Sequence, residues 1–182
     1  PKGYSDTITV LEKVGHFLDE ENQLLFRQYK NEGYSNQEIS ALIAENISLK
    51  KVLQDSSKDW DGGYAIGGII GHGDSFVMRD PWGIRPAHYY IDDEIVVVAS
   101  ERPVIQTVMN VPDEDIYEIT PGNALIMKKN GEIGEEQIRV PEERKSCSFE
   151  RIYFLLHFSF LNTIMTIQQY VFAIRFGVRC IH

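Results

Sequence analysis

The sequence is poor in cysteine and in basic residues. Its 182 residues include two cysteines, Cys147 and Cys180, too few for a disulfide framework or for a zinc site built from cysteines. The 18 lysines and arginines are outnumbered by 27 acidic residues, and the net charge is −9. Because a nucleic-acid backbone binds to basic surfaces, we expect no nucleic-acid partner. No charged and then apolar leader follows Pro1, so we expect no secretory signal and a cytoplasmic location.

Acidic residues are absent from the last part of the chain. All 27 precede Ile152, and only Arg175 and Arg179 carry a formal charge from there to the C-terminus. The uncharged stretch Ile152–Ile174 is long enough to span a bilayer. Polar residues recur in it at helical spacing, which favours a packed or interfacial helix. We therefore interpret residues 155–182 as an apolar helical tail of uncertain origin.

The first third of the chain has helical patterns. Apolar residues recur at helical spacing and predict a helix over residues 7–20: Ile8, Leu11, Val14 and Leu18. Ser35 followed by Glu38 fits a capping box, in which each side chain accepts a hydrogen bond from the other residue's backbone N–H. The second helix begins there and should end before the polar run at residues 54–59.

After Trp60 the pattern changes to short β-rich runs separated by turn residues. The predicted strands are Gly63–Ile70, Ser75–Arg79, Ala87–Ile91, Glu94–Ala99, Ile116–Ile119, Ala124–Lys128 and Ile133–Val140. Asp92-Asp93 and Asn130-Gly131 predict tight hairpin loops, the second with positive φ at both central residues. Two helices followed by an antiparallel meander predict an α+β fold.

Most local motifs in this region favour a structural role. The glycine-rich run from Gly62 to Gly71 lacks the Lys-Ser/Thr pair of a phosphate loop, so we expect close sheet packing there. The five histidines show no metal-ligand spacing, and no metal site is expected: His16, His72, His88, His157 and His182. We interpret His72, which lies between glycines, as a loop residue.

The stretch Arg79–Pro86 reads Arg-Asp-Pro-Trp-Gly-Ile-Arg-Pro. Pro81 fixes φ and Gly83 permits positive φ, while Asp80 can cap the turn or pair with an arginine. An ion pair between an arginine and Asp80 across the hairpin is one expectation. The hairpin is more consistent with a structural role than with direct substrate contact.

This stretch resembles the RDPxGIRP hairpin of amidophosphoribosyltransferases, the glutamine-dependent enzymes of purine synthesis. Its flanks agree in order: Ile69–Gly73 precedes it, and Ala99-Ser100-Glu101 and Pro121-Gly122 follow it. The run Cys147–Phe154 then resembles the CxFExxYF segment that closes the glutaminase domain of this family. The resemblance covers residues 4–154, so we interpret residues 1–154 as the later part of a class II glutamine amidotransferase domain.

The resemblance implies an N-terminal-nucleophile fold, an αββα sandwich that is partial here. In this family an N-terminal cysteine attacks the carboxamide of glutamine, with its own α-amino group as the base. The ammonia then displaces pyrophosphate from phosphoribosyl pyrophosphate, which a second domain binds with magnesium. Residue 1 is proline and no cysteine precedes Cys147. We therefore expect a truncated domain that has no catalytic residue and no cofactor of its own, from a full-length homo-oligomer.

One substrate-binding residue follows from the resemblance. Tyr4-Ser5-Asp6 is similar to the family's Ser-Asp step before a helix, whose aspartate holds the α-amino group of glutamine. The alternative for Asp6 is an acidic residue that stabilises the N-terminus of a helix.

Other interpretations remain open. Cys147 aligns with a cluster ligand of iron–sulfur-bearing family members, but a buried free thiol is the preferred interpretation. Another class II amidotransferase, such as the glucosamine-6-phosphate-forming type, is the first rival. A non-catalytic interaction fragment that is held at a membrane by its tail is the second.

Overall fold

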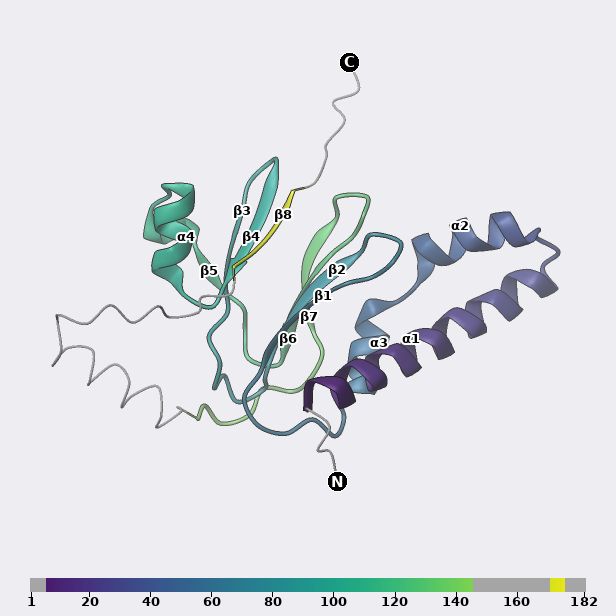
Figure 1. Cartoon of the computed structure of the whole chain (residues 1–182), viewed down its shortest axis with the longest axis horizontal. Helices are drawn as coiled ribbons and strands as arrows, with labels where there is room; N and C mark the ends of the chain where they lie inside the picture. Colours follow the sequence, from purple (N-terminus) through teal and green to yellow (C-terminus); the bar gives the residue numbers. More distant parts are fainter. Residues whose placement is uncertain (1–5, 146–170, 176–182) are drawn as a thin grey trace, which may run out of the picture. The chain divides into compact units, whose positions relative to one another are not determined.

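The computed structural model describes residues 6–145 and 171–175 (Figure 1). The chain divides into two compact units, Pro1–Asp61 and Gly62–His182. The first unit is helical and the second contains the β-strands. The predicted boundary after residue 154 lies outside the described residues and stays a prediction.

The helical unit consists of α1 (Asp6–Asn31), α2 (Asn36–Asn46) and α3 (Leu49–Ser56). α1 continues well beyond the predicted end at residue 20, because apolar residues keep the helical period. Its core with α2 is a cluster of apolar side chains: Leu18, Leu25, Tyr29, Ile39, Ile43 and Ile47. The capping box is confirmed, since the Glu38 backbone N–H donates to Ser35 and the Ser35 backbone N–H donates to the Glu38 carboxylate.

The second predicted helix is divided into α2 and α3. Ile47 has extended backbone angles, φ −62° and ψ 130°. Ser48 then caps a new helix, because its Oγ accepts a hydrogen bond from the Lys51 backbone N–H at 3.3 Å. The new helix α3 enters the polar run and ends at Ser56. The apolar period is nearly continuous across this break, so the serine cap is the only local signal for it.

The predicted strands are confirmed, with ends that shift by up to three residues. They are β1 (Ala65–Ile69), β2 (Ser75–Arg79), β3 (His88–Ile91), β4 (Ile95–Ala99), β5 (Tyr117–Glu118), β6 (Asn123–Met127) and β7 (Ile133–Gln137). The described strands form two antiparallel sheets, β1-β2-β6-β7 and β5-β3-β4-β8. The strands are therefore not one meander, because the chain crosses from one sheet to the other after β2 and returns after β5.

An apolar core joins the two sheets. β2 and β6 contribute Val77, Leu125 and Met127, and β4 contributes Val96 and Val98. Val97 and Ala99 face the opposite way and pack with Ile105 of α4 (Arg102–Met109). α4 was missed by sequence reasoning, although Pro103 at its start and the left-handed Asn110 after its end are helix boundary signals.

Two predicted hairpin loops are present, and one has a different geometry. The Asp92 carboxylate accepts hydrogen bonds from the backbone N–H groups of Glu94 and Ile95, both at 2.8 Å. In the β6–β7 loop Gly131 has φ 91°, but Asn130 does not have positive φ. The expectation of positive φ at both residues was wrong, because this longer loop needs only one left-handed residue after its turn.

The helix predicted for the tail does not hold at Val171–Arg175, which forms β8. This strand pairs antiparallel with β4, from Ile95↔Arg175 to Ala99↔Val171. Valine, phenylalanine and isoleucine favour strands, and an open sheet edge offers backbone hydrogen bonds that a helix cannot use. The remainder of the predicted tail helix lies outside the described residues. No helix in the described part of the chain is long and apolar enough to cross a membrane.

Candidate functional site

The stretch Arg79–Pro86 connects β2 of one sheet to β3 of the other. It is a turn between the two sheets and not the hairpin that the sequence predicted, because β2 and β3 do not pair with each other. Asp80 is fully buried at its centre. Its Oδ1 accepts hydrogen bonds from the backbone N–H groups of Trp82 at 3.1 Å and Ile84 at 3.0 Å, and its Oδ2 accepts one from Arg85 at 2.9 Å. A carboxylate with three backbone donors fixes the path of this loop. Asp80 therefore caps the turn, as one of the two sequence interpretations proposed.

The buried guanidinium of Arg79 connects this turn to β5. Arg79 is 1% exposed, and its Nε donates to the Arg85 carbonyl at 2.7 Å. Nη1 donates to the Ile119 carbonyl at 2.6 Å and lies 2.7 Å from a carboxylate oxygen of Glu118. Arg79 therefore forms its ion pair with Glu118 and not with Asp80, which was one expectation from the sequence. The reason is geometric, since Asp80 faces the backbone of its own turn.

Two titratable groups beside Arg79 are shifted. Burial raises the pKa of Glu118, but the hydrogen bond and charge of Arg79 outweigh this, and the net pKa is below the ordinary value. Burial lowers the pKa of His88, and the Ser100 carbonyl, 3.3 Å from its Nδ1, only partly offsets this. Glu118 is therefore ionised and His88 neutral at pH 7. Sequence reasoning missed Glu118, because its partner Arg79 lies on a strand that is distant in sequence.

A segment at residues 139–145 contacts the turn Arg79–Pro86. The Glu142 backbone N–H donates to the Pro81 carbonyl at 2.8 Å, and the Lys145 backbone N–H donates to the Trp82 carbonyl at 3.0 Å. The Trp82 ring has two cations near its face, with Arg139 at 5.8 Å and Lys145 at 5.3 Å from its centroid. Such contacts contribute about 0.5–1 kcal/mol each at exposed sites. These hydrogen bonds and cation–π contacts hold residues 139–145 against the turn.

A second buried carboxylate joins two turns of the first sheet. Asp74 is 1% exposed and lies 2.8 Å from Nζ of Lys128 and 3.1 Å from Nε2 of His72. Its Oδ1 also accepts a hydrogen bond from the Lys129 backbone N–H at 2.8 Å. Burial raises the pKa of Asp74, and these partners together lower it below the ordinary value. His72 lies in a loop as expected, and its ring is in contact with the Asp74 carboxylate.

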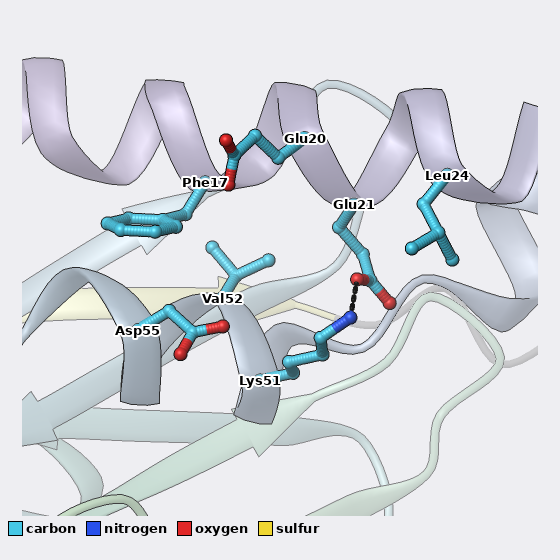
Figure 2. Close-up of a pocket in the computed structure, with 7 residues that line it drawn as sticks. All are labelled: Phe17, Glu20, Glu21, Leu24, Lys51, Val52 and Asp55. Atoms are coloured by element: carbon cyan, nitrogen blue, oxygen red, sulfur yellow. Dashed lines mark hydrogen bonds and ion pairs between the residues drawn. The ribbon is translucent and has the colours of Figure 1, made fainter.

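The helical unit has a small cavity of about 110 Å³ between α1 and α3. Side chains of the two helices point toward one another across it (Figure 2). Glu21 is largely buried and pairs with Lys51, and this hydrogen bond raises the pKa of Lys51. The lining is Phe17, Glu20, Glu21, Leu24, Lys51, Val52 and Asp55. These side chains include no serine, threonine, cysteine or histidine.

Asp6 is the first residue of α1 and is exposed. That position fits both sequence interpretations, a ligand for an amino group and a helix-terminal acid, so its role stays a prediction. Cys147 lies outside the described residues. Among residues 6–145 and 171–175, no three His, Cys, Asp or Glu side chains are grouped to hold a metal ion.

Comparison with known proteins gives sequence relatives. The chain is 33% identical over 86 residues to a protein of Methanothermobacter thermautotrophicus named as a candidate glutamine amidotransferase. It is 30% identical over 121 residues, 65% of the chain, to an amidophosphoribosyltransferase of Archaeoglobus fulgidus. The chain is related in sequence to glutamine amidotransferases. It spans about a quarter of the length of these relatives, 27% and 25%. The resemblance seen in the motifs is thereby confirmed.

Two solved structures are also similar to this chain. A glutamine phosphoribosylpyrophosphate amidotransferase from B. subtilis, complexed with ADP and GMP, has a TM-score of 0.48 and 28% identity, and covers 72% of this chain and 30% of that chain. A structure described as the allosteric regulatory enzyme of purine biosynthesis has a TM-score of 0.47 and 28% identity, over 74% of this chain and 30% of that chain. The relationship to amidotransferases therefore rests on the sequence comparison. No protein-family model matches the chain.

Proposed function

We propose that this chain is part of the glutamine-hydrolysing domain of an amidophosphoribosyltransferase. The similarity over 121 residues to the Archaeoglobus fulgidus enzyme carries this proposal. The pair between buried Arg79 and Glu118 and the Asp80 cap support it, because they give a structural reason for the Arg79–Pro86 motif. In the full protein, glutamine and phosphoribosyl pyrophosphate are the substrates, and released ammonia forms phosphoribosylamine. A cytoplasmic location and a homo-oligomeric full-length protein are part of the proposal.

A chimera tests this function. Residues 6–145 would replace the corresponding segment of the Archaeoglobus fulgidus enzyme, and pyrophosphate release would be measured with glutamine or with ammonia as the nitrogen donor. We expect activity with both donors. The ammonia reaction is the control for folding of the rest of the enzyme. Activity with ammonia but none with glutamine would contradict the proposed role of this chain.

We further propose that Asp6 binds the α-amino group of glutamine. Its place at the start of α1 leaves the carboxylate exposed and able to accept hydrogen bonds from an ammonium group. In the chimera, Asp6→Asn should raise the KM for glutamine at least tenfold and leave the ammonia reaction unchanged. Glu12→Gln on the same helix is the control and should change neither. An unchanged KM in the Asp6 variant would leave only the helix-terminal role.

The 182-residue polypeptide by itself should not hydrolyse glutamine. Its cysteines are Cys147 and Cys180, and neither can act through a free α-amino group. Loss of a catalytic nucleophile costs on the order of 10⁶ in rate. Glutamate release would be measured against a heat-inactivated sample. Turnover in a pure preparation would contradict this part of the proposal.

A further inference from the structure

The strand β4 is buried on both of its faces. Val96 and Val98 belong to the core between the sheets, while Val97 and Ala99 pack in the cluster with α4. None of these four residues is more than 5% exposed. A strand that pairs with β4 therefore extends two apolar layers at once. It needs apolar residues at consecutive positions, rather than the alternating pattern of a half-exposed strand.

One side of β4 pairs with β3, and β8 occupies the other. The register runs without a bulge over five pairs, and it places Ile174 opposite Val96 and Phe172 opposite Val98. Residues 171–174 read Val-Phe-Ala-Ile, which is the consecutive apolar sequence that this edge requires. Residues 146–170 separate β8 from the rest of the sheet unit in sequence. β8 is thus a distant segment that completes the sheet at its edge.

We propose that the outer edge of β4 is a strand-binding site for an extended apolar segment in antiparallel register. Residues 171–175 fill the site within the chain, and the same residues of a second copy fill it when the chain's own strand is displaced. The backbone N–H and C=O groups of the edge supply the affinity, and the two apolar layers select the sequence. Because residues 171–175 belong to the same chain as β4, they fill the site at micromolar protein concentration in preference to the same residues of a second copy.

The first test measures amide hydrogen exchange of β4 in the intact 182-residue chain. With β8 in place, all the β4 amides have a neighbouring strand and should be protected. Without it, alternate amides would face solvent and exchange quickly. Protection of consecutive β4 amides is expected. Rapid exchange at every second β4 residue would show that the edge is open and would overturn the proposal.

The second test measures binding of a labelled synthetic peptide of residues 169–177 to full-length variants. Successive N–H groups of a strand point to opposite sides, so only one of residues 173 and 174 donates a hydrogen bond to β4. Proline has no N–H, so one of the variants Ala173→Pro and Ile174→Pro loses that hydrogen bond and the other keeps it. The variant that loses the hydrogen bond should bind the peptide at least tenfold more tightly than the unchanged chain. The other proline variant is the matched control and should bind the peptide no more tightly than the unchanged chain. Exchange protection of β2 and β6 checks that each variant is folded.

The peptide itself provides the last control. N-methylation at residue 173 or at residue 174 should abolish binding for one peptide and leave it intact for the other, because only one of the two N–H groups faces β4. No binding to either variant, or equal binding of both methylated peptides, would overturn the strand-binding site.

Discussion

Gly83 provides the sharpest test of the structural role of the turn Arg79–Pro86. Its φ is 64°, in the left-handed region, and an added Cβ would lie 3.0 Å from Cγ of Pro121 and 3.4 Å from Nη2 of Arg79. Gly83→Ala therefore adds backbone strain of about 1–2 kcal/mol. Crowding against the proline ring adds about 1–3 kcal/mol in a well-packed site. We expect the free energy of unfolding to fall by roughly 2–5 kcal/mol.

Two other glycines separate these contributions. Gly131 has φ 91° with no atom within 4 Å of an added Cβ, so Gly131→Ala carries the strain without the crowding. Gly71 has neither a positive φ nor a close neighbour, and Gly71→Ala should have almost no effect. Urea denaturation of the full chain would give the three free energies, with unchanged m values as the check on two-state unfolding. Equal losses at Gly83 and Gly131 would refute the crowding argument.

Three further changes test individual contacts. Asp80→Asn replaces one acceptor oxygen by an amide donor that faces the Arg85 N–H or its neighbours, so stability should fall by about 1–3 kcal/mol in urea denaturation; no loss would mean that the turn does not need the carboxylate. The pKa of Glu118 is lowered, so its contribution is present above its ordinary pKa of 4.5 and is lost as pH falls through the lower folded value. Glu118→Gln should therefore flatten the dependence of melting temperature on pH below about 4.5, and an unchanged profile would argue against the pair with Arg79. Ser35→Ala removes the cap of α2 and should cost about 1 kcal/mol, measured by the same denaturation, with the exposed Ser40→Ala as its control.

The strands could be predicted from sequence because their signals are local. Turn residues bound each apolar run, and Ser75–Arg79 matches β2 at both ends. The assignment of these strands to two sheets could not be predicted, since it depends on where the chain crosses after Arg79 and returns after Glu118. The break between α2 and α3 was missed because a single capping serine does not change the apolar periodicity. The helix α4 was missed because it is too short to give a periodic pattern, and its starting proline is the main signal for it.

The site was predicted only in part, for a related reason. Asp80 and Gly83 act within one turn, so the motif itself indicates a capped turn, although not that this turn connects two different sheets. Glu118 reaches Arg79 from a strand distant in sequence, and the cations beside Trp82 come from residues 139–145. Contacts of this kind follow from the tertiary fold. The strand at 171–175 was mistaken for helix because its partner edge on β4 exists only after the sheet has formed.

The proposed function is that this chain is part of the glutamine-hydrolysing domain of an amidophosphoribosyltransferase. The most direct measurement is the ratio of glutamine-dependent to ammonia-dependent pyrophosphate release by the chimera, compared with its Asp6→Asn variant. We predict that glutamine supports the reaction in the chimera. In the Asp6→Asn variant the ratio of glutamine-dependent to ammonia-dependent release should fall at least tenfold at subsaturating glutamine, because the ammonia reaction is unchanged. A folded chimera that uses ammonia and ignores glutamine would contradict the claim.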